Sequence, residues 1–196
     1  MFTCDNECLD VEIRKYQISK KYKKDNIKII MISESIPRND EDYFDGPDIP
    51  TFIENTNTLF NNIGYKYRTY DDYLKNGVYL TTALKCVKKD YLVSSKTIEN
   101  CSYLLEKELD QFRNLKVIML MGDFAIKAIN YIYKRKCGKR IIPNGATYKI
   151  RNDEYVFNRI RFIPSYTQTG DSFGIEKTKT KMMEEDINKA MKSLGK

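Results

Sequence analysis

The chain has 196 residues, a length that fits one domain with a full hydrophobic core and a buried sheet. Lysine and arginine (34) outnumber aspartate and glutamate (27), giving a formal net charge of +7, and 15 tyrosines accompany this excess. Histidine is absent, which excludes Ser-His-Asp and Cys-His hydrolases and enzymes with histidine-ligated metals.

The hydropathy of the chain, its first residues and its basic composition lead to further predictions. No apolar stretch is long enough to span a bilayer, and the polar, acidic start is unlike a signal peptide. We therefore expect one domain over residues 1–196, soluble and cytoplasmic, with no membrane partner. A basic, tyrosine-rich surface suits a polyanion such as a nucleic acid.

The first half of the chain predicts two strands and two helices. Residues 14–24 are strongly basic and are expected to form a helix and then a loop. The apolar run at residues 27–32 predicts a buried strand that ends in a loop at residues 33–37. Residues 51–62 predict a helix that stops at Gly64, and residues 78–84 predict a second strand.

The second half continues the alternation. Residues 97–112 have the pattern of an amphipathic helix, residues 116–121 that of a third buried strand, and residues 122–136 that of another helix. A hairpin is expected around Asn152-Asp153, followed by a last strand at residues 161–163 and a helix at residues 175–192. This order predicts a three-layer α/β/α domain with a central, mostly parallel, four-stranded sheet.

Ligands of such sheets bind where loops leave the carboxyl ends of the strands. The loops at residues 33–44, 82–89 and 165–174 therefore define the candidate site.

Four of the five cysteines form two groups along the chain, Cys4 with Cys8 and Cys86 with Cys101, while Cys137 stands alone. Free thiols of a cytosolic core, a zinc site and disulfides are all open interpretations. Zinc usually takes two short knuckles, of which only Cys4-x3-Cys8 is present, and disulfides need an oxidising compartment. Iron–sulfur clusters are held by thiolates from short local spacings and distant segments, so we favour a [4Fe–4S] cluster.

Several motifs follow one another in an order that a known family shares. Cys4 and Cys8 form an N-terminal pair, and residues 30–37 (IMISESIP) are a strand followed by an acidic turn. Residues 80–86 (LTTALKC) resemble a Thr-Asn-Ala-Val-Lys-Cys strand, and Pro164-Ser165 resembles the end of His-Pro-Ser. Together they resemble the iron–sulfur, thermophile-type branch of the uracil-DNA glycosylase superfamily over most of the chain. The resemblance implies that family's fold, DNA glycosylase activity, and a [4Fe–4S] cluster on Cys4, Cys8, Cys86 and Cys101.

The sequence departs from this family in the motifs that carry chemistry. Ser33, Ser35 and Pro37 replace glycines of the first motif. Thr82 stands where the family has the asparagine that reads the uracil edge, and Ile163 replaces the histidine before Pro-Ser. An atypical modified pyrimidine, including a modified base of phage DNA, is therefore an alternative substrate to uracil.

The resemblance also implies residue roles. Base excision passes through an oxocarbenium-like sugar while the base leaves as an anion. Glu34 is the candidate for the carboxylate beneath the sugar or on the attacking water, with Asp42 as a lesser candidate; a surface acid or a helix cap is the alternative for Glu34. Phe44 is the candidate for stacking on the flipped base, although aromatic residues are more often core. The other residues expected at the base are Ser35, Ile36, Thr82 and Ser165.

DNA contacts are expected from two segments. Lys85, Lys88 and Lys89 flank Cys86 and would meet phosphates, and Tyr166 or Gln168 would fill the gap left by the flipped nucleotide. We expect a monomeric, monofunctional DNA glycosylase. Two other classes stay open: a nucleic-acid-binding protein with the fold and cluster but no turnover, and an iron–sulfur electron carrier.

Overall fold

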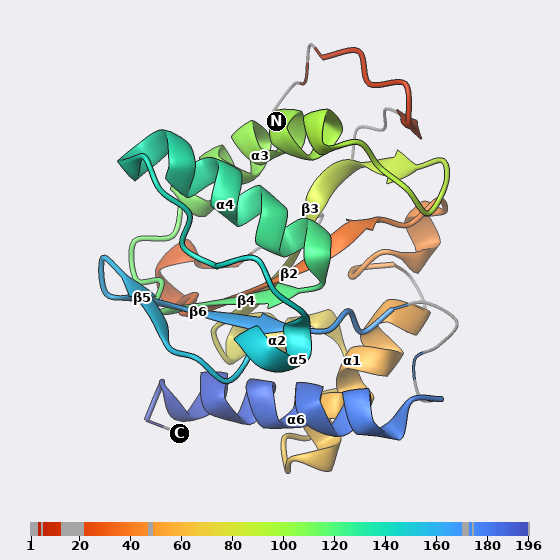
Figure 1. The fold of residues 1–196 in the computed structure, drawn as a ribbon. Coiled ribbons are helices and arrows are strands. Elements are labelled where there is room, and N and C mark those ends of the chain that lie inside the picture. Colours follow the sequence, from red (N-terminus) through yellow and green to blue (C-terminus); the bar gives the residue numbers. More distant parts are fainter. Residues whose placement is uncertain are drawn as a thin grey trace.

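The computed structural model describes residues 4, 6–12, 22–46, 49–169, 173 and 175–195. A sheet with the strand order β1-β3-β2-β4-β6-β5 lies between two layers of helices (Figure 1). Helices α3 (Ser95–Leu109) and α4 (Asp123–Cys137) cover one face. The helices on the other face are α1 (Thr51–Asn62), α2 (Tyr70–Lys75) and α6 (Lys177–Lys192). The prediction of a three-layer α/β/α fold is confirmed.

The four central strands run parallel to one another. They are β3 (Val78–Lys88), β2 (Ile29–Ile36), β4 (Val117–Met121) and β6 (Ile160–Ser165). Their side chains are buried on both faces, as expected for strands with a helix layer on each side. Two short antiparallel strands at the edges, β1 (Val11–Glu12) and β5 (Tyr155–Phe157), extend the sheet to six strands rather than the four expected. They are too short for a periodic pattern to reveal them.

Strand β2 continues beyond the point where the sequence predicted a loop. Ser33 pairs with Thr82 and Ser35 with Leu84 of β3, and the register shifts only between Ser35 and Ile36. The first polar residues of the predicted loop are therefore fixed by a neighbouring strand. This places Glu34 on a rigid element at the carboxyl end of the sheet.

The predicted hairpin around Asn152-Asp153 is wrong. Residues 147–150 form a short helix, α5 (Thr147–Ile150), and the hairpin joins β5 to β6 through Asn158 and Arg159. Both turn residues have positive φ, 49° and 66°, as the tight two-residue turn between antiparallel strands requires. Two short 3-10 turns, η1 (Lys24–Asn26) and η2 (Asp40–Asp42), are the remaining elements of the described segments, and residues 14–21 of the predicted basic helix lie outside them.

Tyrosine contributes to the core more than expected. Tyr67 and Tyr73 pack on Phe60 with ring centroids 5.1 Å away in each case, beneath α1 and α2. Among the tyrosines that the structure describes, six are buried: Tyr43, Tyr67, Tyr70, Tyr73, Tyr79 and Tyr133. The abundance of tyrosine thus reflects packing as well as surface. Among the described residues, no helix has the length and apolarity needed to cross a membrane.

Candidate functional site

An ion pair lies at the carboxyl end of the two central strands. Lys88, the last residue of β3, donates from Nζ to Oε2 of Glu34 on β2 at 3.0 Å. Both side chains are partly exposed, at 29% and 24%. The ammonium also lies 5.7 Å from the ring centroid of Phe124 in the first turn of α4. Lys88, expected to meet DNA phosphate, therefore holds the predicted carboxylate in place.

Gly122 lies beside this carboxylate and has a backbone conformation that favours glycine. Gly122 precedes α4 with φ 104°, a conformation that L side chains rarely adopt. A Cβ at this position would lie 3.4 Å from Oε1 of Glu34 and 3.5 Å from Cβ of Thr167. The loops after β4 and β6 thus lie next to Glu34, as predicted for a site formed at the carboxyl ends of the strands.

Polar side chains on the other face of the same strands form a second group. Ser33 and Thr82 are register partners on adjacent strands, and both are buried. Thr82 donates from Oγ1 to the carbonyl oxygen of Leu84 at 2.8 Å. Burial raises the pKa of Tyr43 well above its usual value, and a hydrogen bond with Thr82 opposes that shift. The hydroxyl of Thr82 is therefore already engaged within the protein, with Leu84 and with Tyr43.

Phe44 belongs to an aromatic cluster beside this group. Its ring centroid lies 4.2 Å from that of Tyr43, 4.4 Å from that of Phe52 and 5.8 Å from that of Tyr70. The side chain is 2% exposed. Phe44 is thus a buried aromatic at the strand ends, which fits the core alternative and leaves stacking on a base as a prediction.

Gln168 lies in the loop after β6 and is fully buried. Its Oε1 accepts a hydrogen bond from Oγ of Ser33 at 3.3 Å, and its carbonyl oxygen accepts one from Nδ2 of Asn55 at 3.1 Å. Its Nε2 has no hydrogen-bond partner among the described residues. This position differs from the exposed one expected of a residue that enters DNA, because the side chain faces the strand ends.

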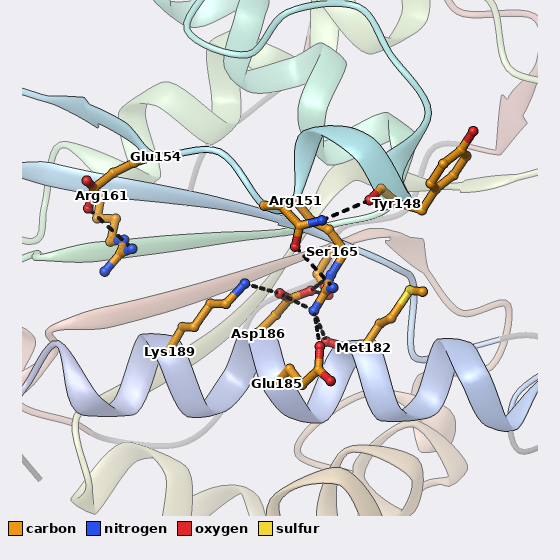
Figure 2. A network of polar contacts seen from close by, with 10 residues as sticks. Tyr148, Arg151, Glu154, Arg161, Ser165, Met182, Glu185, Asp186 and Lys189 are labelled. Carbon is orange, nitrogen blue, oxygen red and sulfur yellow. Dashed lines mark hydrogen bonds and ion pairs between the residues drawn. The ribbon is translucent and has the colours of Figure 1, made fainter.

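Ser165 is part of a buried polar network rather than of an open pocket (Figure 2). Its Oγ donates to Oδ2 of Asp186 at 2.8 Å, and Arg151 binds the same carboxylate through Nε at 3.0 Å and Nη2 at 2.8 Å. Burial raises the pKa of Asp186, and the hydrogen bonds from Arg151 and Ser165 oppose the shift. Since its proton goes to Asp186, Ser165 ties β6 to α6, and its contact with a base stays a prediction.

The sequence did not reveal Arg151 and Asp186 as network residues. Asp186 lies in the charged run Glu184-Glu185-Asp186, which resembles a solvated helix face. Arg151 also donates to the carbonyl oxygen of Met182 at 2.8 Å and to Glu185 at 2.9 Å. The helical periodicity of residues 177–192 was the signal that could have shown the burial of Asp186, because it places this residue on the same face as the buried Met183, Ile187 and Ala190.

Two of the four predicted cluster cysteines contact each other. Cys86 at the end of β3 and Cys101 on α3 are 5% and 2% exposed. A hydrogen bond with Cys86 and burial raise the pKa of Cys101, and Cys4 lies close enough to contribute in the same direction. Cys8 accepts a hydrogen bond from Nδ2 of Asn100 at 3.5 Å, next to Cys101.

The segment that carries Cys4 and Cys8 is attached to the domain through β1 and Asp10. Val11 pairs with Lys88, and Asp10 accepts hydrogen bonds from the backbone N–H of Ser94 at 2.6 Å and from Oγ1 of Thr97 at 2.5 Å. The fold therefore gathers both cysteine groups at one edge. Within the described parts of the chain, however, no group of three or more Cys, His, Asp or Glu side chains is arranged to hold a metal ion.

The other predicted residues lie around this site with partners of their own. Lys85 binds Oε2 of Glu108 at 2.6 Å, so its charge is used within the protein rather than displayed to DNA. Lys89 is exposed and donates to the carbonyl oxygen of Leu9 at 2.7 Å, and Tyr166 is partly buried, 5.6 Å from Nζ of Lys179. Asp42 is exposed in η2, while Ser35 and Ile36 close β2, the former partly and the latter fully buried.

A cavity of about 540 Å³ lies at the opposite, amino ends of the strands. Its cationic lining consists of Lys28, Arg113, Lys116, Arg159 and Arg161. Arg161 pairs with Glu154 at 3.3 Å, as Figure 2 shows. A neighbouring cavity of about 390 Å³ shares Lys28 with it. Positive charge is therefore present at both ends of the sheet.

Comparison with known proteins identifies the family. A search of curated proteins found no match. The sequence matches the family model of the uracil DNA glycosylase superfamily over residues 20–190, a range that includes all four parallel strands and the loops that follow them. This match, together with the parallel sheet and the polar groups at its carboxyl end, shows that the chain belongs to the uracil-DNA glycosylase superfamily.

Proposed function

We propose that this protein hydrolyses the N-glycosidic bond of a modified or damaged base in DNA. Members of the superfamily are DNA glycosylases, and the Glu34–Lys88 pair is the observation that supports this activity most directly. It supplies a carboxylate at the carboxyl end of β2, where ligands bind in open α/β sheets. The net charge of +7 favours association with DNA.

In the proposed reaction the target nucleotide is flipped out of the duplex. The bond between C1′ and the base nitrogen breaks, and its electron pair leaves with the base. A water oxygen bonds to C1′ and its proton passes to the carboxylate of Glu34. The departing base anion takes a proton from solvent. Lys88 holds Glu34 in position through the 3.0 Å contact, and the negative charge of the carboxylate stabilises the cationic sugar.

The substrate we propose is a pyrimidine, either uracil or a modified pyrimidine such as a base of phage DNA. Thr82 replaces the amide with which related sequences read the base. Its hydroxyl proton is bound to the carbonyl oxygen of Leu84, so Thr82 can only accept a further hydrogen bond from a ligand. Base recognition must therefore differ from the two-point reading that an asparagine provides.

We also propose that Cys4, Cys8, Cys86 and Cys101 hold a [4Fe–4S] cluster. An all-cysteine donor set suits iron–sulfur ligation, and the contact between Cys86 and Cys101 and the nearness of Cys4 support the assignment. The four thiols would fix the N-terminal segment against β3 and α3, beside Lys88. Anaerobically purified protein should contain iron and sulfide in equal amounts and be coloured, and the variant Cys101→Ser should lose both. Iron-free wild-type protein would overturn this proposal.

The test of the activity uses duplex and single-stranded oligonucleotides that carry uracil or one of a panel of modified pyrimidines. After incubation, alkali cleaves the strand at each abasic site, and mass spectrometry identifies the released base. Glu34→Gln should lower single-turnover excision by about 10²-fold or more, as expected for loss of a group that acts on the reacting proton. Glu154→Gln, a change of an exposed carboxylate that pairs with Arg161 near the amino end of β6, is the matched control and should retain activity.

The result that contradicts this proposal is retained, salt-sensitive DNA binding without excision of any base in the panel. That outcome would favour the alternative, a nucleic-acid-binding protein that keeps the fold without turnover. Equal activity of Glu34→Gln and wild type would instead reject Glu34 while leaving the glycosylase activity in place.

A further inference from the structure

A buried amide nitrogen without a partner lies at the strand ends. Gln168 is fully buried, yet its Nε2 makes no hydrogen bond with any described residue. Buried polar groups in folded proteins are nearly always paired, because an unpaired donor has lost its hydration without compensation. Such a group is retained at a functional site when a ligand supplies the missing acceptor.

Contacts from β2 and α1 hold Gln168 in this position. Ser33 on β2 donates to Oε1 at 3.3 Å, which fixes one end of the amide and leaves Nε2 as the open end. Asn55 on α1 donates to the backbone carbonyl of Gln168 at 3.1 Å, and this contact fixes the loop after β6. Ser33 is also the register partner of Thr82 on the adjacent strand. The free donor therefore lies beside the position where related sequences carry their base-reading amide, and the loop after β6 must shift for a base to reach it, because the side chain is fully buried.

The chemistry of the proposed reaction requires a donor at this place. As the glycosidic bond breaks, negative charge moves onto the ring carbonyl oxygens of the pyrimidine, and a hydrogen bond to such an oxygen strengthens in the transition state. The chain has no histidine to supply that bond, and the hydroxyl protons of Thr82 and Ser165 are bound to Leu84 and Asp186. Gln168 has a buried donor that is not engaged.

We infer that Gln168 donates from Nε2 to a ring carbonyl oxygen of the flipped pyrimidine and stabilises the base as it leaves. This inference rests on the proposed glycosylase activity. It assigns to Gln168 the role of leaving-group donor, in place of the surface contact with DNA that the sequence predicted. The substrate class it implies is a pyrimidine with an unblocked carbonyl oxygen.

The experiment compares Gln168→Leu with wild type on duplexes that contain uracil or 5-fluorouracil, in single-turnover assays. Leucine has a similar volume and no donor, so excision of uracil should fall by about 10²-fold or more, as for loss of one donor to a developing oxyanion. The anion of 5-fluorouracil is more stable and needs less help, so its excision should fall by a smaller factor. A purely structural role of Gln168 would lower both rates by the same factor.

Protein stability provides an independent readout. Gln168→Leu removes an unpaired buried donor but also the Oε1 that accepts from the buried Ser33 hydroxyl, so its urea midpoint should fall only slightly while its excision rate falls steeply. Gln111→Leu, a change in the turn after α3, is the matched control and should leave excision unchanged. Wild-type rates in Gln168→Leu, or equal losses on the two bases, would overturn the inference. Absence of excision by the wild type would reject the proposed function itself, which separates the two failures.

Discussion

At the scale of single residues, the turn beside Glu34 depends on the backbone conformation of residue 122. We predict that Gly122→Ala destabilises the protein by about 1–3 kcal/mol, because φ 104° is strained for alanine. It should also lower base excision, because relief of this strain would shift the turn that lies against Glu34 and Thr167, although the new Cβ itself would make ordinary contacts at 3.4 and 3.5 Å. Urea unfolding and single-turnover excision measure the two effects.

Gly138→Ala is the matched control for this change. Gly138 ends α4 with φ 77°, and an added Cβ would meet no atom within 4 Å. The control should lose comparable stability while keeping its excision rate. If both variants kept the wild-type excision rate, the turn at Gly122 would have no role in placing Glu34.

The buried pair of Arg151 and Asp186 predicts a second effect of single residues. Removing Arg151 leaves the fully buried Asp186 carboxylate without its main partner, so Arg151→Leu should cost about 3–5 kcal/mol in the free energy of unfolding. The double variant Arg151→Leu/Asp186→Leu should cost less, since no charge is left unpaired. Arg161→Leu removes a more exposed pair with Glu154 and should cost less than about 1 kcal/mol. Similar losses for Arg151→Leu and Arg161→Leu would contradict this account.

At the scale of elements, the N-terminus of α2 makes stability depend on pH. Backbone N–H groups of Thr69 and Arg68 each donate to Oδ2 of Asp72 at 2.9 Å, and these bonds lower the pKa of Asp72 below 3.8. A carboxylate with a lowered folded-state pKa contributes stability above its unfolded pKa and loses that contribution as the pH falls through the folded value. Asp72→Asn should therefore cost about 1 kcal/mol at pH 7.

The difference between wild type and Asp72→Asn should shrink as the pH falls from 7 through 3.8 towards the lower folded-state pKa. Urea unfolding of both proteins across this range measures it. A difference that stays constant with pH would show that the charge of Asp72 does not contribute to the cap.

Long elements were predictable from sequence because their patterns are strong. Residues 51–62 coincide with α1, where the apolar spacing is helical; β4 is a continuous apolar run, and β2 and β3 each begin with one. Short elements were not predictable. Helix α2 spans six residues and β1 only two, and β1 exists because β3 offers it an edge. Local pattern carries little information where tertiary contact decides the structure.

The same distinction applies to the candidate site. Glu34, Thr82 and Pro164-Ser165 could be placed at the strand ends because short motifs carry them. The pairing of Glu34 with Lys88, the burial of Gln168 and the role of Asp186 depend on residues 54, 135 and 21 positions apart in the chain. No local spacing indicates such contacts.

At the scale of the whole molecule, two basic regions at opposite ends of the sheet can be separated by experiment. The proposed site lies at the carboxyl ends of the strands, so DNA should bind there. Reversing Lys89 and Lys96 to glutamate should weaken binding of a uracil-containing duplex about tenfold or more and reduce its salt dependence, because phosphate contacts are lost. Fluorescence anisotropy at several salt concentrations measures both quantities.

Lys28→Glu/Lys116→Glu is the matched control at the amino ends. It changes the net charge by the same amount, in the cavity lined by Arg113 and Arg159. This variant should bind and excise like wild type on short duplexes. The opposite result, in which only the amino-end variant loses binding, would move the DNA-binding face to the other end of the sheet.

The strand order also has a consequence for synthesis on the ribosome. Strand β2 lies in the middle of the sheet, yet one of its partners, β4, begins only at Val117. The apolar face of α1 is covered even later in synthesis, because it packs against α6, which starts at Lys177. A nascent chain therefore exposes an unpaired strand edge and an apolar helix face until nearly the whole chain has left the ribosome. Shortened chains that lack α6 would keep that surface uncovered and aggregate.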